Sequence, residues 1–171
     1  PGHLRGPWRG NTPGGGFVES PVIRVKNGSG PTILFTGGVH GDEYEGQIAV
    51  SRLARSLDPA KVQGRVIMIP ALNMPAVLND TRLSPVDNRD MNRCFPGNPN
   101  GNLTEQAAYA MMQLIEQEGL DIAIDMHEAE LFYPVTNCIV APDKSMNIAS
   151  FARLSAPYEI VSFRSPQSAR G

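Results

Sequence analysis

The stretch "GGVHGDEYEG", residues 37–46, joins a predicted strand to a predicted helix. The apolar run at 32–38 ends in two glycines and suits a strand that is buried on both faces. Apolar residues recur at helical spacing over 44–57, which predicts a helix there. Between the two lies His40, one of three histidines in the chain, followed three residues later by Glu43. The stretch therefore places scarce ionisable groups where a strand passes into a helix.

Predicted strands and helices alternate along the rest of the chain. Further strands are predicted at 21–27, 64–72, 121–127, 137–142 and 159–163. Two more helices are predicted, one that begins after an N-cap at Thr104 and stops at Gly119, and a second at 144–154. This alternation predicts an α/β fold, with a sheet covered by helices on both faces.

The composition describes a soluble globular protein with one domain. The chain has 171 residues, of which 41% are hydrophobic and 19% are charged. A net charge of −2 indicates no nucleic-acid partner, and no apolar run approaches the ~20 residues of a membrane span. Cys94 and Cys138 are far apart in the sequence, and we expect free thiols in a reducing compartment. With no signal-peptide core in the opening residues, we expect a cytoplasmic location.

The opening segment differs in composition from the rest of the chain. Nine of its first sixteen residues are Gly or Pro, which predicts a loop or flexible arm over residues 1–19. Residues 20–171 are then the predicted domain. The first residue is Pro1 rather than Met, and we expect the chain to be a piece of a longer protein.

Three features converge on one edge of the predicted sheet. In open α/β sheets, ligands bind beyond the carboxyl ends of the strands. His40 follows one predicted strand, and His127 ends another. A polar segment without periodicity, residues 79–103, follows a third, and a loop of this length is usually functional. We call this segment the 79–103 loop.

The ionisable groups at this edge match a metal site. Catalytic zinc commonly takes three protein ligands and keeps a position for water. His40 and Glu43 can face one point if their segment enters a helical turn. His127 is the favoured third ligand, because His3 lies in the predicted arm, and Asp125 is on the right face of its strand to orient His127. The alternative is that the histidines are only packed or solvated.

Three blocks in the same order carry a resemblance to a known family. They are "GGVHGDEYEG", "DMNRCFPG" at 90–97 and "DMH" at 125–127. Together they resemble the succinylglutamate desuccinylase/aspartoacylase family of zinc carboxypeptidase-like hydrolases, over residues 20–165. The bacterial N-acyl amino acid deacylase branch is most similar. The resemblance implies a mixed, mostly parallel sheet that is incomplete at the C-terminus, and one zinc ion per chain.

The resemblance also implies roles for individual residues. It implies that His40, Glu43 and His127 are the zinc ligands. It implies that Asn92 and Arg93 hold the carboxylate of the substrate, with which a guanidinium can form two parallel bonds.

For the arginine that polarises the scissile carbonyl, the resemblance indicates Arg82, with Arg89 as a rival, and either could be only solvated. The alternative for Arg93 is a structural salt bridge. Cys94 is predicted to pack and not to act as a nucleophile.

The implied reaction is hydrolysis of a small N-acyl amino acid by metal-activated water. Zinc lowers the pKa of its water to ~7, a carboxylate transfers the proton to the leaving amine, and an arginine stabilises the oxyanion. In the family the carboxylate is a glutamate beyond the third ligand, and it is not identified in this chain. Glu128 is a weak candidate, because neighbouring residues on a strand point to opposite faces. Glu130 is a weak candidate too, because it is better suited to contact the substrate or the loop.

Other readings of the sequence stay open. The chain could come from a zinc carboxypeptidase that acts on peptides, or from a metal-binding relative that lacks the general base and is not catalytic. It could also be a structural domain with incidental histidines. We expect no nucleic-acid or membrane partner, and a homo-oligomer is compatible with the sequence.

Overall fold

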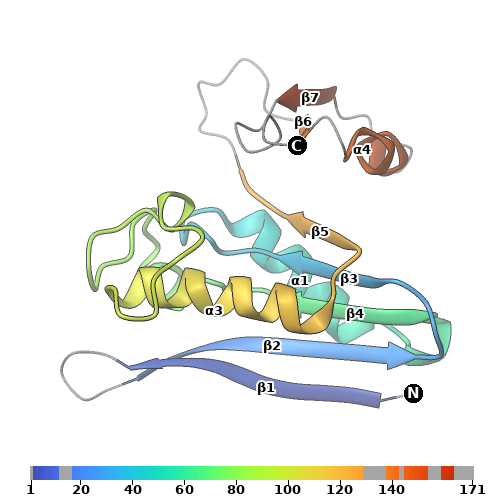
Figure 1. The fold of residues 1–171 in the computed structure, drawn as a ribbon, viewed down its shortest axis with the longest axis horizontal. Coiled ribbons are helices and arrows are strands. Elements are labelled where there is room, and N and C mark those ends of the chain that lie inside the picture. Colours follow the sequence, from blue (N-terminus) through green and yellow to red (C-terminus); the bar gives the residue numbers. More distant parts are fainter. Residues whose placement is uncertain (1, 12–16, 129–137, 143–144, 154–158, 164–171) are drawn as a thin grey trace. The chain divides into compact units, whose positions relative to one another are not determined.

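A computed structural model describes residues 2–11, 17–128, 138–142, 145–153 and 159–163 (Figure 1). The chain divides into two compact units, Pro1–Glu128 and Ala129–Gly171, which are described separately. None of the helices in the described ranges is long and apolar enough to cross a membrane.

The first unit is built on a five-stranded sheet with the order β1-β2-β4-β3-β5. The bounds of these strands are Gly2–Asn11 for β1, Phe17–Asn27 for β2, Thr32–Thr36 for β3, Gly64–Ile69 for β4 and Ile122–Asp125 for β5. Strand β3 lies between β4 and β5 and is parallel to both, whereas β2 is antiparallel to β1 and β4. The predicted mixed sheet is confirmed, and β4, β3 and β5 form its parallel part.

One long helix covers each face of this sheet (Figure 1). Helix α1 (Tyr44–Ser56) packs Val50 and Ala54 onto a core that contains Val25 and Met68. Helix α3 (Leu103–Glu118) packs on the other face, where its buried residues Ala107 and Met111 join a core that contains Val22, Leu34 and Ile67. Val22 and Val25 belong to different cores because side chains along a strand alternate between its faces. The prediction of helices on both faces is confirmed.

Residues 2–11, for which the sequence predicts a loop, form β1 instead. This strand pairs with β2 from Gly2 opposite Lys26 to Asn11 opposite Phe17. Strand β1 has only one neighbour in the described sheet, and an edge strand tolerates Pro7 because one side of its backbone needs no partner. The predicted boundary between residues 19 and 20 falls inside β2, so the division into an arm and a domain is wrong at this point.

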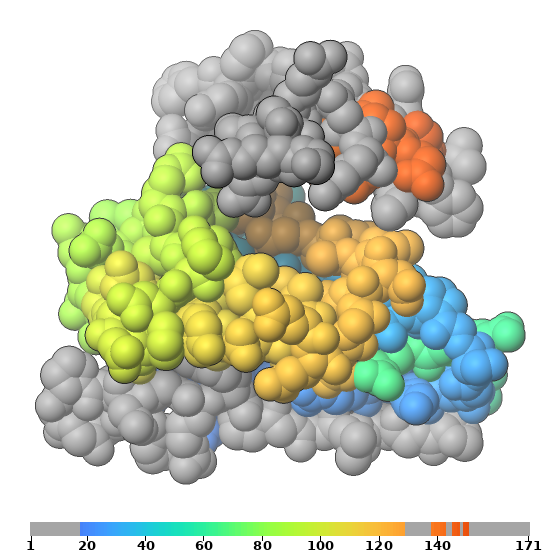
Figure 2. All heavy atoms as spheres, viewed as in Figure 1, coloured from blue at the N-terminus to red at the C-terminus, as the bar shows by residue number. Residues whose placement is uncertain are grey.

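The 79–103 loop is tied to the start of α3. Asn102 is the N-cap of α3 and forms a capping box with Glu105, so the predicted N-cap at Thr104 is wrong. Thr104 instead donates two hydrogen bonds of 2.8 Å, from its backbone N and its hydroxyl, to the carboxylate of Asp87 in the loop. Helix α3 ends before Gly119, as predicted, and Gly119 adopts the left-handed conformation. Figure 2 shows the loop in yellow-green against α3 in yellow.

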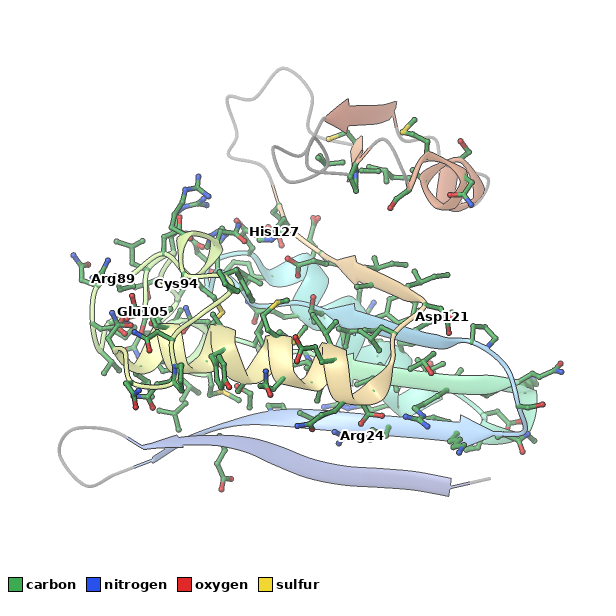
Figure 3. All side chains as sticks on the ribbon, viewed as in Figure 1. Arg24, Arg89, Cys94, Glu105, Asp121 and His127 are labelled. Atoms are coloured by element: carbon green, nitrogen blue, oxygen red, sulfur yellow. The ribbon has the colours of Figure 1, made fainter. Side chains whose placement is uncertain are left out.

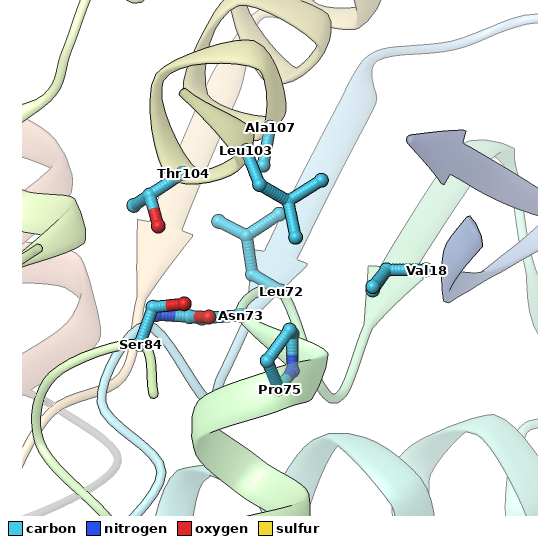
Figure 4. A pocket seen from close by; sticks show the side chains of 8 residues that line it. All are labelled: Val18, Leu72, Asn73, Pro75, Ser84, Leu103, Thr104 and Ala107. Atoms are coloured by element: carbon cyan, nitrogen blue, oxygen red, sulfur yellow. The ribbon is translucent and has the colours of Figure 1, made fainter. Parts of the chain in front are cut away.

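Two short helical segments occur at the start of this loop and within it. Helix α2 (Met74–Asn79), which the sequence analysis did not identify, leads into it, and the 3-10 turn η2 (Met91–Arg93) lies within it. A small cavity lies between α2, the loop and the first turn of α3 (Figure 4). Ser84 lines this cavity, and its buried hydroxyl has no hydrogen-bond partner among the described residues.

The second unit contains a two-stranded parallel sheet. Strand β6 (Cys138–Pro142) pairs with β7 (Glu159–Phe163), and α4 (Met146–Arg153) connects them in sequence. These three elements confirm the predicted strands and helix in this region. Cys94 and Cys138 are both free thiols, as expected.

Candidate metal centre

His40 lies in the connection between β3 and α1, which is held closely against α2. The backbone N of Gly41 donates a 2.8 Å hydrogen bond to the carbonyl of Thr81. A Cβ atom at Gly41 would lie only 2.0 Å from the carbonyl oxygen of Ala76, so this position requires glycine. The contact fixes the backbone next to His40, whose side chain is 1% exposed.

Glu43 is the N-cap residue of α1, but its side chain does not cap the helix. The backbone is held from within the helix, because Gln47 Nε2 donates to the carbonyl oxygens of Gly41 (2.8 Å) and Glu43 (3.0 Å). The carboxylate of Glu43 is therefore free to turn toward the carboxyl ends of β3 and β5.

His40, Glu43 and His127 come together at this edge, and we call them the metal-site triad. One ligand atom from each lies within 4.8 Å of the other two. Nδ1 of His40 is 2.6 Å from Oε1 of Glu43, and Nδ1 of His127 is 2.7 Å from Oε2 of Glu43. The two Nδ1 atoms and the carboxylate thus face one another, whereas both Nε2 atoms point outward. Figure 3 shows His127 at the end of β5.

Each outward nitrogen meets a carboxylate. Nε2 of His127 is 2.8 Å from Oδ2 of Asp125, so the predicted contact between these two residues is present. Nε2 of His40 is 3.0 Å from Oδ1 of Asp90, a contact that the sequence analysis missed. Thr36 holds Asp125 in turn through a 2.6 Å hydrogen bond from its hydroxyl. Carboxylates on the outer nitrogens fix the ring orientation and the tautomer of histidine ligands.

These contacts shift the pKa values of the triad. Burial raises the pKa of Glu43, but hydrogen bonds from His127, His40 and the backbone of Glu128 outweigh it and lower the value to about 2. Hydrogen bonds to Asp125 and Glu43 outweigh burial and raise the pKa of His127 to about 10. Burial lowers the pKa of His40, yet its bonds to Glu43 and Asp90 raise it overall.

The residues of the triad fit a zinc ion by the chemistry of their donor atoms. Two imidazole nitrogens and one carboxylate oxygen are a common ligand set of catalytic zinc, which leaves one coordination position for water or substrate. The three atoms already face one another, and both imidazoles are oriented from behind by carboxylates. Among these ligands His127 has the most exposed side chain, at 31%.

Of the two candidate arginines, Arg82 lies beside the triad. Its Nη1 atom is 3.3 Å from Oε1 of Glu43, and its Nη2 atom is 3.8 Å from Oδ2 of Asp90. Arg89 is exposed and makes no ion pair with any described residue. Figure 3 labels Arg89 and Cys94, both in the 79–103 loop, and burial raises the pKa of the Cys94 thiol. The structure thus brings Arg82, and not Arg89, to the triad.

Asn92 and Arg93 lie in η2, immediately after Asp90. Their side chains are exposed and form no hydrogen bond or ion pair within the described ranges. The backbone N of Asn92 donates a 2.9 Å hydrogen bond to Oδ1 of Asp90, the same atom that contacts His40. The turn that carries these two side chains is therefore attached to the triad through Asp90.

Three other residues were considered from the sequence, of which Cys94 and Glu128 have defined contacts. Cys94 is partly buried and donates from its thiol to the carbonyl of Asp90 at 3.3 Å, as a packing residue would. The carboxylate of Glu128 accepts a hydrogen bond from the backbone N of Glu45. Glu130, the second weak candidate for the general base, lies outside the described residues.

The family comparison covers most of the chain. A sequence model of the succinylglutamate desuccinylase/aspartoacylase catalytic domain matches residues 29–170. The chain is 44% identical over 127 residues to the N-alpha-acetyl-L-2,4-diaminobutyric acid deacetylase of Halomonas elongata, an alignment that covers 74% of this chain and 36% of that enzyme.

Solved structures share the fold. A succinylglutamate desuccinylase/aspartoacylase from Rhodobacter sphaeroides is 51% identical, with a TM-score of 0.78 over 88% of this chain and 48% of that one. A metallo-carboxypeptidase from Pseudomonas aeruginosa, 13% identical, has the same fold with a TM-score of 0.55 over 71% of this chain and 34% of its own. The chain spans about half the length of the Rhodobacter protein and about a third of the Halomonas enzyme. This chain belongs to the succinylglutamate desuccinylase/aspartoacylase family.

Proposed function

We propose that the chain provides the zinc site and the substrate-holding residues of a hydrolase that cleaves the amide bond of a small N-acyl amino acid. The observation that carries this proposal is the metal-site triad, in which two imidazoles and a carboxylate face one another while Asp90 and Asp125 hold the outer nitrogens. Such an arrangement suits one zinc ion per chain. A bound zinc ion would polarise the scissile carbonyl and lower the pKa of a water molecule.

Arg82 is the residue that we assign to the carbonyl oxygen of the substrate. Its side chain is 42% exposed and reaches Glu43 and Asp90 only at 3.3 and 3.8 Å, so it can turn toward a ligand at small cost. A guanidinium beside the scissile bond stabilises the negative charge that develops on the oxygen. We assign Arg89 no role in catalysis.

Asn92 and Arg93 are the residues that we assign to the carboxylate of the substrate. Both side chains are exposed, and neither is engaged by another described residue. An arginine without a partner can form two parallel bonds with a carboxylate, and the neighbouring amide can add another. No described residue is assigned as the general base. Glu128, the candidate within the described residues, instead accepts a hydrogen bond from the backbone N of Glu45.

We propose an N-acetylated amino acid as the first substrate to test, because the Halomonas relative is an N-alpha-acetyl-L-2,4-diaminobutyric acid deacetylase. The first measurement is the zinc content of the purified chain and of its His40→Ala and His127→Ala variants. We expect about one zinc per chain, lost in both variants and retained in His3→Ala, which changes the third histidine. A folded chain that binds no zinc would contradict the proposal.

Hydrolysis assays on the zinc-loaded chain then separate the alternatives. Release of acetate from N-acetyl-2,4-diaminobutyrate, with no cleavage of peptides, supports the deacylase. Cleavage of a peptide at its C-terminal residue would instead support a carboxypeptidase. Because no described residue is assigned as the general base, zinc binding without any hydrolysis would fit both a metal-binding relative that lacks the base and a deacylase whose base lies outside the described residues.

A further inference from the structure

The N-terminus of helix α1 lacks a capping group from its own N-cap residue. The first backbone N–H groups of a helix need acceptors from outside the helix, and the N-cap side chain commonly supplies one. In α1 that residue is Glu43, whose carboxylate is directed at His40 and His127 instead. The side chain of the N-cap residue therefore belongs to the metal-site triad and does not cap the helix.

Glu128 supplies the missing acceptor from another part of the chain. Its carboxylate accepts a hydrogen bond from the backbone N of Glu45, in the first turn of α1. A negative charge at this end of a helix is also favoured by the helix dipole. In the other direction, the backbone N of Glu128 donates a 3.1 Å hydrogen bond to Oε2 of Glu43.

The two hydrogen bonds are reciprocal, in the manner of a capping box, but they connect residues 83 and 85 positions apart in the sequence. Oε2 of Glu43, the atom that Glu128 holds, is also the atom that faces Nδ1 of His127. Close packing supports the same junction, because a Cβ atom at Gly46 would lie 2.7 Å from Cβ of Met126. The first turn of α1 therefore rests directly on the segment that carries His127.

We propose that Glu128 is a positioning residue, which fixes Glu43 relative to His127 by joining the N-terminus of α1 to the end of β5. This inference rests on the zinc site proposed above. Through its side chain Glu128 holds the helix, and through its backbone it holds the carboxylate of Glu43. Without the side-chain bond, the first turn of α1 could move away from β5 and take one zinc ligand with it.

The test compares three variants in the full chain. Glu128→Ala removes the acceptor, whereas Glu128→Gln keeps an oxygen at the same place without the charge. Glu45→Ala is the matched control, because it removes a carboxylate from the same helix end but leaves the backbone N of residue 45 in place. The two readouts are the zinc dissociation constant, measured by competition with a chelator, and hydrogen exchange of the residue-45 amide in the metal-free chain.

We expect Glu128→Ala to weaken zinc binding about 10- to 100-fold and to remove protection of the residue-45 amide. Glu128→Gln should stay within about threefold of the unmodified chain in zinc affinity and keep the amide protected. Should the alanine variant not fold, Glu128→Asp replaces it, because the shorter side chain keeps the charge but withdraws the oxygen. An aspartate that binds zinc as well as the unmodified chain would then overturn the proposal.

Other results would also overturn the inference. Unchanged zinc affinity in Glu128→Ala would show that the contact does not position the ligand. An equal loss in Glu45→Ala would show that the effect is one of charge alone. Absence of zinc binding by the unmodified chain would contradict the proposed function itself, and the amide exchange of residue 45 would still report on the hydrogen bond.

Discussion

Asp90 Oδ1 lies 3.0 Å from His40 Nε2, although 50 residues separate them in sequence. The same oxygen accepts a 2.9 Å hydrogen bond from the backbone N of Asn92, which starts the turn η2. One carboxylate thus orients a candidate zinc ligand and begins the turn that presents Asn92 and Arg93. The geometry of the metal site and that of the candidate substrate-binding turn are therefore coupled through Asp90.

Replacing Asp90 by Asn should weaken zinc binding more than the same change at Asp125. We expect a loss of about 10- to 100-fold for Asp90→Asn, because the outer partner of a histidine ligand raises its basicity. The Asp90 side chain is 19% exposed and that of Asp125 is 42% exposed. Water can therefore substitute more easily for the carboxylate of Asp125 as the partner of its histidine. Chelator competition measures both constants. A larger loss in Asp125→Asn would contradict this order.

Arg93→Gln should weaken the binding of an N-acyl amino acid to the zinc-loaded chain by about tenfold or more, because it removes the proposed carboxylate partner. Arg89→Gln is the matched control, since it changes another exposed arginine of the same loop. Titration calorimetry with N-acetyl-2,4-diaminobutyrate measures both affinities. Equal losses in the two variants would indicate general attraction between charges and remove the assignment of Arg93.

The stability of the fold should depend on pH through Glu118, which accepts a 2.9 Å hydrogen bond from Arg24 Nε and pairs with Arg65. Burial raises the pKa of Glu118, but the two arginines outweigh it and lower the value below its ordinary 4.5. Its contribution is therefore complete above pH 4.5 and is lost as the pH falls through the lower pKa of the folded state.

Glu118→Gln should accordingly reduce the free energy of unfolding at pH 7 by about 1–2 kcal/mol, and the difference should shrink at pH 3. Urea denaturation of the metal-free chain at both pH values measures this. Glu116→Gln, on an exposed position of the same helix, is the control and should change little. A larger difference in unfolding free energy at pH 3 than at pH 7 would contradict this account.

Ser84→Ala should stabilise the chain. The Ser84 hydroxyl is fully buried and lacks a hydrogen-bond partner among the described residues, and burying such a group is unfavourable. We expect the free energy of unfolding to rise by about 1 kcal/mol, as measured by urea denaturation. Destabilisation by the same substitution would mean that the hydroxyl has a partner, such as an internal water molecule.

The sequence predicted the elements whose side chains are buried in a regular pattern. Strand β3 and helix α1 have such patterns, and the triad was found because His40 and His127 lie just beyond the ends of strands. Strand β1 was missed because its glycines and Pro7 are also residue types of loops, and only its pairing with β2 distinguishes a strand from a loop here.

The contacts of Asp90 and Glu128 were not predictable in the same way. Asp90 lies in a loop without periodicity, so its approach to His40 depends on the path of the whole loop. Glu128 is adjacent to a predicted ligand, but nothing local indicates that its side chain reaches the first turn of α1. Both contacts are fixed by tertiary structure and leave no pattern in nearby residues.

The place of β5 in the sheet has a consequence for the metal. Within the part of the chain that the structure describes, this four-residue strand is hydrogen-bonded to β3 alone, and His127 lies two residues after its end. His40 and Glu43 come from the connection between β3 and α1, which leads into the helix. An ion held by all three would cross-link the last strand of the sheet to its first helix. We therefore expect chelation to loosen β5 before any other strand of this sheet.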